Sequence, residues 1–230
     1  MGTLHVVATP IGNRRDLSPR AAEILGQVEV VVAEDTRHSG LLLSSIGAHP
    51  RYISLPGERE GARVAQVLEA LSVGDVALIS DAGMPAVSDP GRQVVDAARR
   101  AGHTVLAVPG PSALVAAVAA SGLRADRFIF LGFLPRTRSR MLRLLQADPE
   151  FAMVFYESPH RLAATLRHAS EVLGDRRVAV AREISKLHES WYLGSAGELA
   201  VLFAELPARG ECTVVVEAVP RGAARRAADG

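Results

Sequence analysis

The sequence of 230 residues has few of the features that directly identify a disulfide-rich, membrane or secreted protein. Its single cysteine, Cys212, excludes a disulfide framework and indicates a reducing compartment. No apolar run reaches the length that spans a membrane. The opening residues, 1–8, lack the basic region and apolar core of a signal peptide. We therefore expect a cytoplasmic protein without membrane contact, in which Cys212 is a buried filler.

An excess of charge of either sign is also absent, since the formal net charge is +1. This composition argues against a protein that binds polyanions through bulk charge alone. Of 26 basic residues only Lys186 is a lysine, and arginines gather locally at Arg136, Arg138, Arg140 and Arg143. That cluster is either a solvated helix face or a set of phosphate contacts.

Several catalytic signatures are missing as well. There is no Gly-x-Gly-x-x-Gly for a dinucleotide, no P-loop, and no Gly-x-Ser-x-Gly elbow of a serine hydrolase. Cysteines and histidines at the spacings of a metal site are absent, so we expect no metal.

The pattern that is present is an alternation of short apolar runs with helical segments. Buried runs joined by helices predict an α/β protein with a mostly parallel sheet in an N-terminal domain, 1–121, and a mixed sheet in a C-terminal domain, 122–219. A basic tail, 220–230, is predicted to be disordered. The expected strands are 4–8, 28–33, 52–55, 76–79, 104–108, 128–133, 151–156, 177–181, 190–193 and 212–218. The expected helices are 19–25, 40–46, 62–71, 91–101, 112–119, 139–147, 161–173 and 196–206.

The most informative segment is Ser80–Gly91, which follows an apolar run and contains two Ser-Asp units eight residues apart. Its hydroxyls, carboxylates and glycine-rich backbone suit a small polar ligand. A capped helix start, with Ser88 or Asp89 as N-cap and Pro90 at the first position, is the alternative.

Unusual residues also follow three other predicted strands, in the segments Thr9–Asn13, Glu34–Arg37 and Pro109–Ser112. Ligands of open α/β sheets bind beyond the carboxyl ends of the strands, so we expect the four loops to meet at one edge. Turns and helix caps are the alternatives for each loop taken alone.

Two further motifs lie in the second half of the chain. Phe155–Arg161 ends a strand and begins a helix with Ser158 and Pro159, a typical capped start. Arg182–Glu189 places five ionisable side chains in eight residues, which indicates either a site or a charged surface hairpin.

Together these motifs resemble, in residues and order, the 16S rRNA (cytidine-2′-O)-methyltransferase branch of the tetrapyrrole methylase superfamily. The resemblance also draws on Gly132–Pro135 and spans Leu4 to about Val219. It implies two α/β domains that hold S-adenosylmethionine in the cleft between them, usually in a homodimer. The methyl acceptor it implies is a cytidine 2′-hydroxyl in the decoding region of the 30S subunit.

The resemblance also implies roles for individual residues. The cofactor-binding residues would be Pro10, Asp81, Ala82, Gly83, Val87, Ser112, Ala113, Phe155, Tyr156, Arg182 and Glu183. Candidates for activating the hydroxyl are Glu34, Asp35 and Lys186, while Asn13 and Arg37 would orient the nucleotide. Phosphate contacts would come from Arg136, Arg138 and Arg140.

Two other functions remain open at this stage. A methyltransferase of the same fold could act on a small tetrapyrrole, which calls for an open apolar trough. A ribosome-assembly protein with a decayed site is suggested by Leu55–Glu60, where members of the branch usually carry a His/Asn-rich segment and only Glu60 matches.

Overall fold

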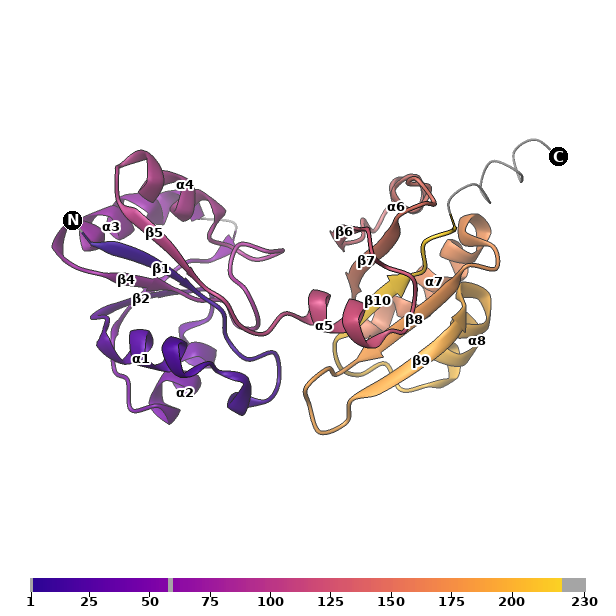
Figure 1. The fold of residues 1–230 in the computed structure, drawn as a ribbon, viewed down its shortest axis with the longest axis horizontal. Helices are drawn as coiled ribbons and strands as arrows, with labels where there is room; N and C mark the ends of the chain where they lie inside the picture. The colour runs from indigo at the N-terminus through magenta and orange to yellow at the C-terminus, as the bar shows by residue number, and fades with distance from the viewer. Residues whose placement is uncertain (1, 58–59, 221–230) are drawn as a thin grey trace. The chain divides into compact units, whose positions relative to one another are not determined.

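A computed structural model describes residues 2–57 and 60–220, and contacts divide the chain into two compact units, 1–112 and 113–230 (Figure 1). Each unit contains one five-stranded sheet. Within the described ranges, no helix has both the length and the apolar character needed to cross a membrane.

The first unit has a wholly parallel sheet in the order β3-β2-β4-β1-β5. Its strands are β1 (Thr3–Val7), β2 (Val30–Ala33), β3 (Arg51–Ser54), β4 (Val76–Leu78) and β5 (Thr104–Val108). Its helices are η1 (Arg14–Asp16), α1 (Pro19–Gln27), α2 (Thr36–Ser45), α3 (Glu60–Val73) and α4 (Arg92–Arg100).

Successive residues of the buried strands in this unit point to opposite faces of the sheet and so belong to two hydrophobic cores. Val30 and Val32 pack with residues of α3 and α4, whereas Val31 and Ala33 pack with residues of α1 and α2. Helices therefore cover both faces, as Figure 1 shows, and the carboxyl ends of all five strands lie along one edge.

The second unit has a mixed sheet in the order β6-β7-β10-β8-β9, in which only β6 and β7 are parallel. The strands are β6 (Phe128–Phe133), β7 (Ala152–Glu157), β8 (Arg177–Arg182), β9 (Ser190–Ser195) and β10 (Cys212–Val216). The helices are α5 (Ala113–Ala120), α6 (Arg138–Leu145), α7 (Pro159–Leu173) and α8 (Ala196–Glu205).

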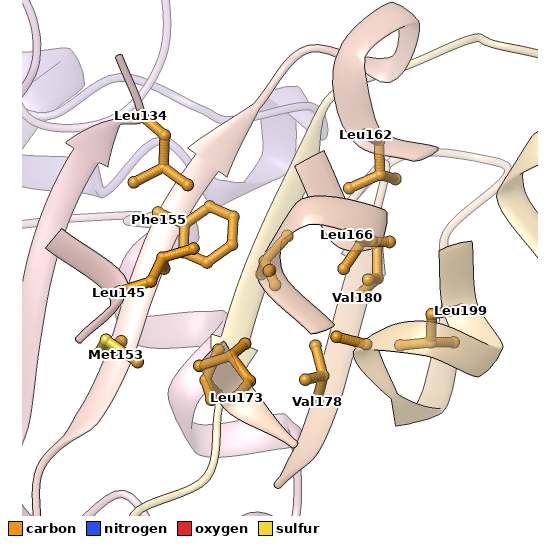
Figure 2. Packing of buried hydrophobic residues seen from close by; sticks show 14 of the residues in the cluster. Leu134, Leu145, Met153, Phe155, Leu162, Leu166, Leu173, Val178, Val180 and Leu199 are labelled. Carbon is orange, nitrogen blue, oxygen red and sulfur yellow. The ribbon is translucent and has the colours of Figure 1, made fainter. Parts of the chain in front are cut away.

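Two cores again lie on the two faces of this sheet. The larger contains residues of α6, α7 and α8, and Figure 2 shows Phe155 beside Leu134 and Leu145 in this core. The smaller core places Ala117 of α5 against Val154 and Val215. The predicted fold class, with a parallel first sheet and a mixed second one, is confirmed.

The division between the units falls before α5, whereas the sequence suggested a boundary after it, at residue 121. The physical reason is that α5 packs on β10 and β7 and so belongs to the second sheet. The predicted tail, 220–230, lies outside the described residues except for Pro220.

Candidate functional site

The loops after β1 and β4 are joined directly at the carboxyl edge of the first sheet. Thr9 and Gly83 form an isolated antiparallel bridge, with N···O distances of 2.9 and 3.1 Å. The buried Thr9 hydroxyl also donates to the carbonyl of Ser80 at 3.0 Å. These bonds hold the start of Ser80–Gly91 against the end of β1.

The loop after β5 joins the same cluster through close backbone contact. A Cβ on Gly110 would lie 2.9 Å from the Cβ of Ala8, so only glycine fits there without displacement. A Cβ on Gly83 would lie 3.5 Å from Ile11 and 3.6 Å from the Pro111 carbonyl oxygen. The loop after β2 joins through Asp35, whose backbone N–H donates to Asp81 at 3.3 Å. The four predicted loops therefore meet at one edge.

The capped-helix interpretation of Ser88–Gly91 is wrong, because neither Ser88 nor Asp89 caps α4. The N-cap is Gly91, which has no side chain to accept a hydrogen bond. The buried carboxylate of Glu60 accepts instead from the backbone N–H groups of Gln93, at 2.5 Å, and Val94, at 3.3 Å. Glu60 thus supplies a remote cap for α4.

The loop itself contains strained backbone. Ala86 and Ser88 have φ angles of 65° and 63°, in the left-handed region that side chains disfavour. Such conformations persist only where surrounding structure enforces them, and they concentrate at binding sites. Val87, between them, is 40% exposed.

Four carboxylates gather along this edge, and we call Glu34, Asp35, Asp81 and Asp89 the acidic edge. Burial, followed by the charges of Asp81 and Asp35, raises the pKa of Glu34. Burial and the charge of Glu34 raise the pKa of Asp89 to about 6, although a hydrogen bond from Ser80 opposes the shift.

Asp35 behaves differently, because it caps α2 by accepting from the backbone N–H of Arg37 at 2.8 Å. The Arg37 guanidinium also lies 3.2 Å from Asp35, and hydrogen bonds from Arg37 hold the pKa of this carboxyl below its usual value. Asn13 similarly caps η1, accepting from the N–H of Arg15 at 3.0 Å. The cap interpretation therefore holds for Asp35, and both polar side chains already have local partners.

The remaining predicted residues of the first unit lie at the same loops. Pro10 and Ser112 are half-buried and Ala82 is exposed. Ala113, the first residue of α5, is half-buried and belongs to the second unit.

In the second unit Phe155 and Tyr156 occupy opposite faces of β7. The Phe155 ring is fully buried in the larger core (Figure 2), so its side chain is unavailable to a ligand. Tyr156 is half-buried and its ring contacts Phe130 and Phe133.

Glu157, the next residue, is a buried carboxylate with three partners. It accepts from the Thr165 hydroxyl at 2.7 Å and from the Ser158 N–H at 2.8 Å, and it lies 3.3 Å from Arg161. Arg161 also donates to the carbonyl of Leu134 at 3.0 Å. The motifs Phe155–Arg161 and Gly132–Pro135 are therefore bonded together.

Lys186 lies in the β8–β9 hairpin and is held by two carboxylates, Glu183 at 2.9 Å and Glu211 at 3.0 Å. Burial opposes the charged form, but these hydrogen bonds outweigh it and raise the pKa of Lys186. Glu183 also accepts from the Glu211 N–H at 2.8 Å, so the hairpin is tied to the loop before β10. Arg182, at the end of β8, is half-buried.

The predicted phosphate contacts lie before and within α6. Arg136, Arg138 and Arg140 are exposed, and Arg138 is paired with Glu171 of α7. Within residues 2–57 and 60–220, neither Arg136 nor Arg140 forms an ion pair, and no three His, Cys, Asp or Glu side chains gather in a group able to hold a metal.

The sequence profile of the Tetrapyrrole (Corrin/Porphyrin) Methylases matches residues 3–200. The chain belongs to the tetrapyrrole methylase family. Relatives named ribosomal RNA small subunit methyltransferase I occur in several bacteria. The Thermotoga maritima relative is 43% identical over 94% of this chain and 98% of its own length. The Pseudomonas aeruginosa relative is 45% identical over 94% and 78%.

Solved structures agree on the tetrapyrrole methylase fold. Uroporphyrin-III-C-methyltransferase from Thermus thermophilus has a TM-score of 0.68 at 24% identity, covering 94% of each chain. Cobalt precorrin-4 methyltransferase has a TM-score of 0.69 at 16% identity, also covering 94% of each chain. At these identities the likeness concerns the fold alone.

Sequence reasoning does not assign the observed roles of two residues, Asp89 and Glu60. It counts Asp89 among the carboxylates of the ligand loop, or alternatively as a helix cap, but does not name it as a site residue. Glu60 was noted without a role, because its partners are 33 and 34 residues away. Cys212 is buried as expected, and burial raises the pKa of its thiol to about 11.

Proposed function

We propose that this tetrapyrrole methylase family member transfers a methyl group from S-adenosylmethionine to a cytidine 2′-hydroxyl in small-subunit rRNA. The observation that carries the proposal is 43% identity over nearly the full length of a relative named ribosomal RNA small subunit methyltransferase I. The relative's name specifies the RNA, and the cytidine and its hydroxyl come from the motif resemblance.

The acidic edge fits the proposed cofactor. S-adenosylmethionine bears a cationic sulfonium and an ammonium group, and it supplies an activated methyl with its own leaving group. Negative side chains at Asp81 and Glu34 attract such a cation, while the loop backbone at 80–83 offers hydrogen-bonding groups. A solved relative of the fold was crystallised with S-adenyl homocysteine, which agrees with this choice.

We place the amino-acid and ribose parts of the cofactor against Pro10, Asp81–Gly83, Val87, Ser112 and Ala113. Tyr156, the Phe155 backbone and Arg182–Glu183 are placed near the adenine. The main work of the protein is then to align hydroxyl and methyl for in-line transfer.

Among the candidates for activating the hydroxyl, we favour Glu34 as the proton acceptor. Glu34 as a whole residue is exposed, but partial burial of its carboxylate and the charge of Asp81 raise its pKa, which makes it a better base than an ordinary glutamate. Asp35 is bonded to Arg37, and Lys186 is neutralised by Glu183 and Glu211. We assign Arg37 and Asn13 to orienting the nucleotide, and Lys186 to holding Glu183 in place.

For the RNA, we propose phosphate contacts at Arg136 and Arg140, with Arg138 joining when its pair with Glu171 opens. The net charge of +1 gives the chain weak general affinity for RNA. We therefore propose that the substrate is the assembled 30S subunit. From the motif resemblance we also propose a homodimer as the active form, and we propose the cytoplasm as its location.

One experiment tests the proposed reaction. The protein is incubated with methyl-labelled S-adenosylmethionine and either 30S subunits lacking the modification or uroporphyrinogen. We expect label in the rRNA at a cytidine 2′-oxygen. Label in the tetrapyrrole would show a different substrate, and cofactor binding without transfer to either would indicate a non-catalytic assembly protein.

A further inference from the structure

An exposed aromatic side chain stands at the end of β6. Phe133 is 60% exposed, although burying a phenylalanine ring is favourable by about 2 kcal/mol. Its ring centroid lies 5.5 Å from that of Tyr156, which in turn lies 5.0 Å from Phe130. Phe133 is thus the exposed end of a row of three rings.

A β-bulge directs Phe133 to this position. In a regular strand residues 131 and 133 would point to the same face. Here the pairing with β7 shifts register between Phe130 and Phe133, and Gly132 has a φ of 61°. Leu131 and Leu134 both pack on the larger core, whereas Phe133 joins Tyr156 on the opposite face. Bulges that redirect a side chain in this way are frequent beside functional sites.

The backbone that follows Phe133 is held rigidly. Arg161 donates to the carbonyls of Leu134, at 3.0 Å, and Pro135, at 3.4 Å. Arg161 is itself fixed by the buried Glu157 at 3.3 Å. The ring is therefore positioned before any ligand arrives, which lowers the entropy cost of binding.

Positive charge lies close to this ring in the sequence. Arg136 and Arg140 are exposed, and neither is neutralised by a carboxylate among the described residues. An exposed aromatic ring with unpaired arginines three and seven residues further along the chain suits unpaired RNA, because bases stack on the ring and the guanidinium groups neutralise phosphates.

We propose that Phe133 is the stacking platform for an unpaired base of the RNA substrate, with Arg136 and Arg140 on the flanking phosphates. This assignment rests on the proposed function and adds the element that recognises a single-stranded stretch. Stacking on an aromatic ring tolerates any base, so the platform sets position and leaves sequence choice to other contacts.

The test compares Phe133→Ala and Phe133→Trp with a matched control, Phe128→Ala. Phe128 lies at the other end of the same strand, is 39% exposed and is remote in sequence from Arg136 and Arg140, and its neighbour Arg127 is paired with Glu150. We expect Phe133→Ala to lower kcat/KM on unmodified 30S subunits roughly ten- to a hundredfold, mostly through KM. Phe133→Trp should retain activity, as should Phe128→Ala.

A second measurement does not depend on catalysis. A decoding-region RNA hairpin with 2-aminopurine at an unpaired position is mixed with each variant at low salt. The wild type and Phe133→Trp should quench its fluorescence, and Phe133→Ala should not. If the wild type quenches but transfers no label, the proposed reaction fails while the platform stands.

Three results would overturn the platform. The first is equal quenching and equal KM for Phe133→Ala and the wild type. The second is an effect confined to cofactor affinity, measured by calorimetry, which would place the adenine on Phe133. The third is a change of oligomeric state in sedimentation, which would make Phe133 part of an interface between two copies of the chain.

Discussion

At the scale of single residues, the polar groups of the site differ in whether they already have strong partners within the chain. The side chains of Asp35, Asn13 and Lys186 already form hydrogen bonds or ion pairs within the chain. Glu34 and Asp89 instead carry raised pKa values. The raised pKa values mean that the charged forms of Glu34 and Asp89 are destabilised, and a cationic ligand can stabilise them.

Asp81 is the carboxylate whose removal should affect the cofactor most. Asp81→Asn keeps an acceptor for the Asp35 N–H but removes the charge, and Asp81→Ala removes both. We expect both variants to weaken S-adenosylmethionine binding about ten- to a hundredfold, because a hydrogen bond to a charged group is worth about 1.5–3 kcal/mol. Calorimetry measures the affinity. Asp96→Asn on the surface of α4 is the control, and unchanged affinity for Asp81→Ala with a native melting curve would remove Asp81 from the site.

Glu34 should control how the rate depends on pH. A base must be deprotonated, so the single-turnover rate should fall as pH drops through the pKa of Glu34. Because that pKa is raised, the fall should begin at a higher pH than for a glutamate with the ordinary value of 4.5. Glu34→Gln should lower the single-turnover rate at saturating cofactor about a hundredfold or more and abolish this dependence, beyond any weakening of cofactor binding that follows from the lost negative charge. A Glu34→Gln profile parallel to that of the wild type would assign the proton to another group.

At the scale of elements, two remote hydrogen-bonding groups stabilise the loops that carry the site. Glu60 at the start of α3 caps α4, which follows Ser80–Gly91. The negative carboxylate also interacts favourably with the positive end of the α4 dipole.

Glu60→Ala should therefore destabilise the protein by about 1 kcal/mol, the usual cost of losing a helix cap. Urea denaturation followed by circular dichroism measures the loss. Glu69→Ala, an exposed position on the same helix, is the matched control. Equal denaturation midpoints for the two variants would show that Glu60 contributes nothing as a cap.

Arg161 is the corresponding residue of the second unit. Arg161→Met leaves the Glu157 carboxylate buried with only neutral donors, Thr165 and the Ser158 N–H. We expect a loss of up to about 3 kcal/mol in the free energy of unfolding, because the buried Glu157 carboxylate loses its charged partner while the half-buried Arg161 side chain is partly solvated. Adding Glu157→Gln should recover part of it.

Thermal and chemical unfolding measure this effect. The exposed neighbour His160 provides the comparison, since His160→Met should change the stability little. If Arg161→Met and His160→Met unfold alike, the network between the motifs at 132–135 and 155–161 is not important for stability.

At the scale of the whole molecule, the low net charge bears on which form of the RNA is used. A chain with a net charge of +1 forms few phosphate contacts without a shaped partner surface. We expect turnover on assembled 30S subunits to exceed that on a short decoding-region hairpin by at least about a hundredfold at physiological salt. Initial rates with labelled cofactor measure both. Equal rates on subunit and hairpin would contradict this substrate preference.

The sequence alone was sufficient for the fold class and for the grouping of the loops. Short apolar runs alternating with amphipathic segments permit few packings other than helices on a sheet, and the carboxyl ends of parallel strands share one edge. For that reason the sequence predicts that four loops lie close together, namely Thr9–Asn13, Glu34–Arg37, Ser80–Gly91 and Pro109–Ser112. Their contacts at Thr9 and Gly83 agree with this expectation.

Only the tertiary structure decided which polar groups are free and which are partnered. Glu60 and α4, Lys186 and Glu211, and Arg161 and Leu134 meet across 25 to 34 residues of chain, and no local pattern encodes such pairs. The side of the sheet that Phe133 faces was likewise hidden, because one bulge reverses the alternation on which a sequence prediction relies. Local periodicity determined the elements and their order, whereas long-range contacts determined how each functional side chain is used.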